Sequence, residues 1–407
     1  MAFPDLLEQA GYFVGMTGKG WAPGNFQVDG RLRNPAGPEF SKRTTKPPHT
    51  GINRNDYAAN FADFFSARPK GQPFYFWYGA TEPHRNYEKG VGLKTGKKLE
   101  DAPPPPFLPD TPEVRSDILD YCVEIEWFDA HLGRMLKLLE EAGELDNTLV
   151  IVTSDNGMPF PRAKGNTYEY GFHVPLAVRW GARARGGRSV DDLIGFVDLS
   201  ATILDAAGVQ HPSNKYPPSG RSIINILTSP KEGVVDQSRT AVYAARERHS
   251  SARYNNWTYP QRALRTTNFL YIRNFRPDRW PAGDPVLLRD DGTLDGPHSG
   301  YKDMDEGGPT LEFLIAKADD PTLGKYLQLA VAQRPAEELY DIKHDPGCLN
   351  NLAAVSKYAD TRRGLATQLD DYLRQTGDAR VLDGGEIWET YPRYAPIRKF
   401  PKPDSQP

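Results

Sequence analysis

A stretch of oxygen-bearing and basic side chains, residues 155–171, directly follows the β-branched run 148–153. The run is typical of a buried strand, and open α/β sheets bind ligands at the carboxyl ends of such strands. Asp155 and Asn156 would offer a carboxylate and an amide oxygen there. Oxygen-only donors favour a hard cation such as calcium or magnesium over zinc. The alternatives are a plain Asp-Asn-Gly turn and, for Lys164 further along the loop, a solvated lysine.

Two further polar residues follow apolar runs. His84 ends the tripeptide Glu82-Pro83-His84 after the aromatic run 73–78, where a histidine can donate to an oxyanion or protonate a leaving group. The alternative is an ordinary surface histidine. Lys19 lies in the glycine-flanked stretch 15–24, which does not have the P-loop spacing because Gly20 follows the lysine. A lysine there still suits anion binding as a point charge.

The elements that must position these residues have α/β character. Between the strand-like runs, apolar residues recur at spacings of three and four over 118–139, and Gly143 is a plausible stop, which predicts one long helix. Strand, helix and strand in this order indicate a crossover sheet whose strands are buried on both faces. Residues 174–179 predict another strand. A helix over 199–207 should follow, with Asp198 as its N-cap and Gly208 at its end.

The pattern changes near residue 239. Short alternating runs at 240–244, 262–265 and 269–272 predict antiparallel strands, and 358–375 predicts a closing helix. The tail after Pro392 is expected to be an extended wrap or disordered. Together these features indicate a small α+β unit.

Composition excludes some functions. The net charge of −3 lacks the basic footprint of nucleic-acid binders, and no apolar run reaches the ~18 residues of a membrane span, so neither nucleic acid nor a membrane is an expected partner. The first residues have no signal-peptide pattern. Cys122 falls on the apolar face of the long helix, where burial is expected. Oligomeric state stays open.

Four separated stretches resemble, in order, signatures of the sulfatase family within the alkaline-phosphatase-like superfamily. They are residues 11–20, 82–84, 153–157 and 338–353. Residues 155–161, 246–249, 259–266 and 334–341 are most similar to the heparan N-sulfatase-like, or sulfamidase, branch. The resemblance implies an α/β fold with a large mixed-sheet sandwich domain over 1–235. A smaller C-terminal α+β domain with an antiparallel sheet would occupy 236–407.

The same resemblance implies a sulfuric ester hydrolase that acts on sulfate esters or sulfamates, on sulfated glycans such as heparan sulfate or on small sulfated compounds. It implies that Asp155 and Asn156 bind Ca²⁺. Lys19, His84 and Lys164 would be the catalytic residues and contact the sulfate, with His84 protonating the departing oxygen or nitrogen. It further implies that the substrate pocket is lined by Arg248 and His249. A periplasmic or secreted location is expected from the family.

The sequence also departs from the family pattern. Members carry two acidic calcium ligands and a Cys/Ser-x-Pro-x-Arg motif, the source of the formylglycine nucleophile, upstream of the Gly-Lys loop. Neither Cys122 nor Cys348 stands in such a motif. Three hypotheses follow. The sequence could lack the first segment of an active sulfatase, in which case the chain by itself is expected to be inactive. Alternatively, it is an inactive paralogue that binds sulfated glycans, or a related metal-dependent phosphoesterase.

Overall fold

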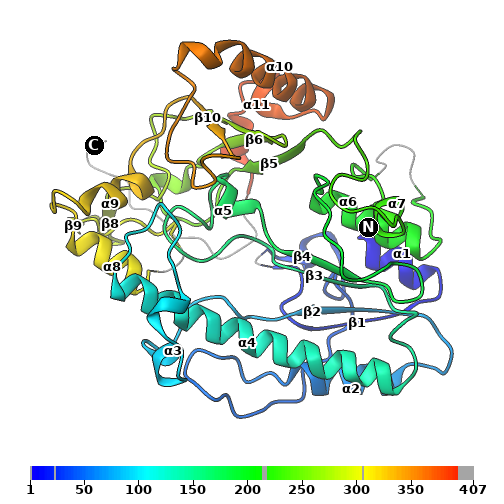
Figure 1. The fold of residues 1–407 in the computed structure, drawn as a ribbon. Coiled ribbons are helices and arrows are strands. Elements are labelled where there is room, and N and C mark those ends of the chain that lie inside the picture. Colours follow the sequence, from blue (N-terminus) through cyan, green and yellow to red (C-terminus); the bar gives the residue numbers. More distant parts are fainter. Residues whose placement is uncertain (1, 23, 213–217, 305–306, 393–407) are drawn as a thin grey trace. The chain divides into compact units, whose positions relative to one another are not determined.

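The computed structural model describes residues 2–22, 24–212, 218–304 and 307–392, so the predicted tail after Pro392 lies outside the described residues. The chain forms two compact units, each assembled from separate segments (Figure 1). The first unit comprises Met1–Val91, Asp120–Thr153 and Leu176–Arg239. The second comprises Gly92–Leu119, Ser154–Pro175 and Thr240–Pro407. The predicted division into 1–235 and 236–407 stays a prediction.

The first unit holds two small sheets and the helices around them. Strands β1 (Phe13–Gly18) and β2 (Phe74–Gly79) pair in parallel, whereas β3 (Val150–Thr153) and β4 (Leu176–Arg179) pair antiparallel. Its helical elements are α1 (Phe3–Gln9), η1 (Phe26–Asp29), α2 (Tyr57–Ala67), most of α4 (Pro112–Glu141), α6 (Phe196–Ala206) and α7 (Ile224–Leu227). The mixed α/β character predicted from the sequence is therefore present.

An aromatic core joins α2 and α4 to the parallel pair. Phe64 of α2 is fully buried and stacks on Phe13 of β1 at 4.9 Å between ring centroids. Met135 and Leu139 of α4 complete this cluster. At Gly15 of β1 a methyl group would lie 2.5 Å from the Phe64 ring, so the helix can approach the strand this closely only over a glycine.

Three details of the sequence interpretation are wrong. β2 and β3 are partly exposed rather than buried on both faces, and Trp77 of β2 is 43% exposed. The reason is that each belongs, among the described residues, to a two-stranded sheet in which every strand is an edge. Asp198 caps α6 from inside its first turn, where it accepts a bond from the backbone N–H of Gly195. Cys122 is only half-buried.

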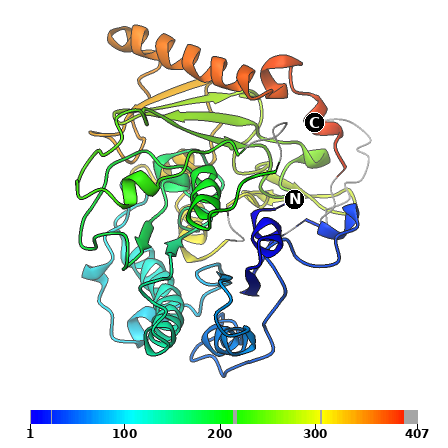
Figure 2. The same ribbon diagram turned by 90° about the vertical axis from the view of Figure 1, so that its right-hand side faces the viewer.

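The second unit is built on a four-stranded antiparallel sheet in the order β10-β7-β6-β5. These strands are β5 (Val242–Arg246), β6 (Gln261–Arg265), β7 (Phe269–Asn274) and β10 (Glu337–Asp341). Helix α10 (Ala359–Gln375) lies along the sheet (Figure 2) and packs three buried leucines, Leu365, Leu369 and Leu373, against it. The predicted strands near 240, 262 and 269 and the closing helix are confirmed.

Smaller elements complete the second unit. They are most of α3 (Val91–Lys94), η2 (Leu99–Asp101), α5 (Glu169–Phe172), η3 (Tyr254–Asn256), the hairpin of β8 (Val286–Leu288) and β9 (Leu294–Pro297), α8 (Pro309–Ala316), α9 (Gly324–Val331), η4 (Ser356–Tyr358), α11 (Ala379–Leu382) and α12 (Ile387–Thr390). No described helix combines the length and apolar composition needed to cross a bilayer.

Candidate functional site

Lys19 is held at the carboxyl end of the parallel pair in the first unit. Gly18 of β1 and Gly79 of β2 lie opposite each other, and the Lys19 backbone N–H donates to the Gly79 carbonyl. The Trp77 indole Nε1–H donates to the Lys19 carbonyl over 2.9 Å. A methyl group at Gly79 would lie 1.9 Å from the Lys19 carbonyl oxygen, so the two strand ends can lie this close only if residue 79 is glycine. The backbone of Lys19 is fixed while its side chain is exposed.

His84 follows β2 at the same edge. Its backbone N–H donates to the Thr81 carbonyl over 3.0 Å, which closes a turn after the strand. Its Nδ1 lies 2.6 Å from the Arg85 carbonyl oxygen. Because a carbonyl only accepts, Nδ1 carries the proton of this bond, which fixes the orientation of the ring. Parallel strands thus bring Lys19 and His84 to one edge of one sheet.

Buried acidic groups support this turn, and the sequence reading did not single them out. Glu82 is buried, and it accepts from the backbone N–H of Asn53 and, over 2.8 Å, from the Tyr57 hydroxyl. Glu124 of α4 is 1% exposed. Among the described residues its Oε2 has no hydrogen-bond partner. Burial, reinforced by the charge of Glu82, raises the pKa of Glu124 to about 8.

A signal for these groups exists in the sequence. Asp120, Glu124 and His131 recur at helical spacing beside the apolar residue Met135, and all four are buried. Ile125, which the apolar periodicity placed on the buried face, is instead 38% exposed. Polar residues that repeat with the period of a helix core are thus an indicator of buried ionisable groups.

The predicted cation ligands begin a closed loop in the second unit. The Gly157 N–H donates to the Gly171 carbonyl over 2.9 Å, and a methyl group at Gly157 would lie 1.8 Å from the Tyr170 oxygen. The Asn156 amide nitrogen donates to the Gly157 carbonyl over 2.8 Å, which fixes that side chain. Asp155 is exposed. Among the described residues, no group of three or more His, Cys, Asp or Glu could hold a metal.

Lys164 lies in the same loop and is buried, with 8% exposure. Its N–H donates to the Met158 carbonyl over 3.1 Å, which folds the loop back on itself. Gly165 follows with φ +73°, and a methyl group there would lie 3.4 Å from Cγ and Nδ1 of His249. The solvated-lysine alternative for Lys164 is therefore wrong, and the predicted substrate residue His249 packs against the turn that carries it.

Arg248, the other predicted substrate residue, is engaged within the second unit. Its Nε–H donates to the Asn256 carbonyl over 2.7 Å, and its guanidinium lies 3.7 Å from Glu389. The first unit thus carries Lys19 and His84, and the second carries the remaining predicted residues. Their convergence in one site stays a prediction.

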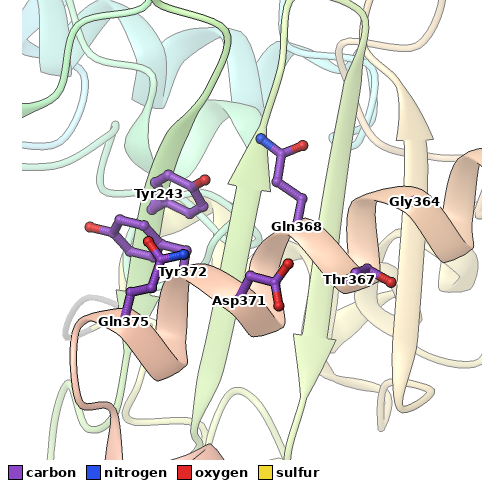
Figure 3. Close-up of a pocket in the computed structure, with 7 residues that line it drawn as sticks. All are labelled: Tyr243, Gly364, Thr367, Gln368, Asp371, Tyr372 and Gln375. Atoms are coloured by element: carbon purple, nitrogen blue, oxygen red, sulfur yellow. The ribbon is translucent and has the colours of Figure 1, made fainter.

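A shallow hollow of about 400 Å³ lies elsewhere in the second unit, between β5 and α10 (Figure 3). Tyr243 and Tyr372 stack face to face there, with ring centroids 3.5 Å apart. Gly364, Thr367, Gln368, Asp371 and Gln375 complete the lining. None of these lining residues is basic and none was predicted as functional, so the hollow does not suit a sulfate.

Comparison with known proteins supports the family resemblance. Residues 1–209 match the family model described as Sulfatase, and residues 163–281 match the one described as N-sulphoglucosamine sulphohydrolase, C-terminal. An ulvan-active sulfatase of Formosa agariphila is 29% identical over 78% of this chain and 48% of its own length. The human N-sulphoglucosamine sulphohydrolase is 26% identical over 93% of this chain and 75% of its own. The chain thus spans about half of the first relative.

The fold is also similar to solved structures. BT4656, in complex with D-glucosamine-2-N,6-O-disulfate, has a TM-score of 0.56 and 19% identity. The similarity covers 92% of this chain and 82% of BT4656. It confirms the predicted alkaline-phosphatase-like architecture.

Proposed function

Because the chain belongs to the sulfatase family, whose model matches residues 1–209, we propose that the protein is a hydrolase of sulfate esters or sulfamates on sulfated glycans. The observation that carries the proposal is the loop from Asp155 to Lys164. It presents oxygen donors at one end and, at the other, a buried lysine beside His249. Such a loop offers oxygen ligands for a cation and a fixed positive charge from the lysine, and both positive charges would stabilise the negative charge of a sulfate group.

The basic residues have separate roles in this proposal. Lys19 and Lys164 bind the sulfate oxygens as point charges, and the burial of Lys164 strengthens its interaction because little water screens it. His84 protonates the leaving oxygen or nitrogen, and the bond between Nδ1 and the Arg85 carbonyl orients its ring. Arg248 and His249 line the pocket for the sugar.

The family is generally metal-dependent, and we assign the metal as calcium. Asp155 supplies a carboxylate and Asn156 an amide oxygen, and this pair of hard donors fits calcium. The Asn156 amide nitrogen is used by the Gly157 carbonyl, so the side chain is fixed through its nitrogen. When bound, the cation supplies positive charge that stabilises the negative charge of the sulfate.

The substrate class comes from the relatives. One acts on ulvan and another on N-sulphoglucosamine according to their names, and BT4656 holds a disulfated glucosamine. We therefore propose a sulfated glycan such as heparan sulfate as the substrate, and a periplasmic or secreted location.

The test measures affinity and turnover for D-glucosamine-2-N,6-O-disulfate. Titration calorimetry in calcium buffer should show binding to the full chain, and Lys164→Ala should weaken it by roughly tenfold or more, the effect of one lost charge-assisted contact. Lys343→Ala, an exposed lysine of the same unit, is the matched control and should change nothing.

Turnover is measured as sulfate released by the protein isolated from its own organism. Release of sulfate supports the proposal. Binding of the disulfate without release of sulfate would overturn the proposal and indicate a glycan-binding paralogue. Faster hydrolysis of a phosphate ester than of a sulfate ester would overturn it and indicate a phosphoesterase. Absence of binding to any of these compounds refutes all three.

A further inference from the structure

A buried carboxylate in the second unit lies directly behind the Lys164 turn. The side chain of Asp303 has 0% exposure. Its Oδ2 accepts from Arg246 over 2.6 Å and from Arg253 over 2.5 Å. Its Oδ1 accepts from the Ser250 N–H over 2.8 Å and from the Ser250 hydroxyl. Both oxygens are thus fully engaged by partners that are themselves buried or half-buried.

Asp303 is ionised at neutral pH. Burial by itself would raise the pKa of Asp303, but the charges of Arg253 and Arg246 and the Ser250 bonds outweigh burial and hold it at about 2. The two arginines also donate to backbone carbonyls, Arg246 to that of Pro281 and Arg253 to that of Trp280, which fixes both side chains around the carboxylate.

The cluster reaches the predicted site through His249. The Asp303 Oδ1 lies 3.8 Å from His249 Nδ1, and the adjacent Ser250 fixes the backbone that carries this histidine. The His249 ring also packs against Gly165, where a methyl group would lie 3.4 Å from its Cγ and Nδ1 and 3.4 Å from the backbone oxygen of Asp303. The chain of contacts Asp303, His249, Gly165 ends one residue from Lys164.

We propose that Asp303 is a positioning residue for sulfate binding: it holds the His249 imidazole against the Lys164–Gly165 turn. This inference rests on the proposed function. The side chain of His249 is 30% exposed, and without a fixed neighbour it would sample several rotamers. Contact with the buried Asp303 carboxylate would hold the ring in one orientation. Asp303 acts through His249 and does not itself contact the substrate.

A double-mutant cycle separates positioning from a merely structural role. The affinity for D-glucosamine-2-N,6-O-disulfate is measured for Asp303→Asn, His249→Ala and the double variant. If Asp303 acts through His249, Asp303→Asn should lower the affinity about tenfold in the native background and less than about twofold in the His249→Ala background. Equal losses in both backgrounds would overturn the proposal, as would no loss in either.

A second variant, with its own control, tests the proposal if Asp303→Asn does not fold. Ser250→Ala removes one hydroxyl bond to Asp303. It should lower the affinity about threefold, again only where His249 is present. Asp278→Asn breaks the surface pair with Arg276 and is the matched control.

If Lys164→Ala leaves binding unchanged, the proposed function fails. If Lys164→Ala weakens binding but the Asp303 and Ser250 variants do not, only the present inference fails.

Discussion

Replacing Glu124 by Gln should remove a pH-dependent loss of stability in the first unit. The native state holds the Glu124 proton up to pH about 8, whereas the unfolded chain releases it near the ordinary pKa of 4.5. Between these values the native state binds more protons than the unfolded state. The free energy of unfolding therefore falls as the pH rises through this window and levels off above it.

The magnitude follows from the two pKa values. At ~1.4 kcal/mol per pH unit, the interval from 4.5 to about 8 sets an upper bound of roughly 5 kcal/mol. We expect about half of this, since water reaches the group when the native state relaxes around a charge. Glu124→Gln has no charge to bury, so it should match the native protein at pH 5 and exceed its stability by ~2–3 kcal/mol at pH 8.

Hydrogen exchange of the α4 amides, from pH 5 to pH 8.5, measures the stability of this unit by itself. Glu126→Gln, an exposed position on the same helix, is the control and should follow the native protein at every pH. The comparison between variants cancels other titrations, such as that of His131, whose pKa burial lowers. A Glu124→Gln stability difference that stays constant from pH 5 to pH 8.5 would refute the reasoning.

Three other substitutions have expected outcomes. Asp198→Ala removes the carboxylate that lies 2.9 Å from the buried Arg239 guanidinium, which keeps its longer contact of 3.6 Å with Asp236, and should cost about 3 kcal/mol in thermal unfolding; a loss below ~1 kcal/mol would contradict this. Gly157→Ala should cost ~1–3 kcal/mol because its methyl group meets the Tyr170 oxygen, while the control Gly133→Ala in α4, with open space around it, should stabilise by up to ~1 kcal/mol. Asp155→Asn should weaken calcium binding roughly tenfold in calorimetry, since ligand charge sets affinity, and an unchanged affinity would remove Asp155 from the ligand set.

Much of the secondary structure could be predicted because it follows from local spacing. The apolar period over 118–139 fixes α4, and alternation fixes β5, β6 and β7. The burial of β2 and β3 could not be predicted in this way. An apolar run shows that a strand is able to be buried, but the exposure of Trp77 depends on which elements lie beside it.

The candidate site, too, could be predicted from the sequence only in part. The positions of Lys19 and His84 after two neighbouring strands could be predicted, because the ends of parallel strands meet at one edge of a sheet, while their roles stay predictions. Asp303 could not be predicted, since its contacts with His249 and with the turn at Gly165 join residues far apart in the sequence. Glu124 was missed because the helix pattern was read for its apolar residues alone.

The segmental make-up of the two units has a consequence for the order of folding during synthesis. Every segment of the first unit precedes residue 240, so that unit can form as soon as this part of the chain has left the ribosome. The segments Gly92–Leu119 and Ser154–Pro175 are also synthesised before residue 240. They pack in the second unit, whose four-stranded sheet is synthesised later. The loop that carries Lys164 must therefore wait, without its final neighbours His249 and Asp303, until that sheet arrives. Shielding of this waiting segment, by a chaperone or by slow translation, would raise the yield of correctly folded protein.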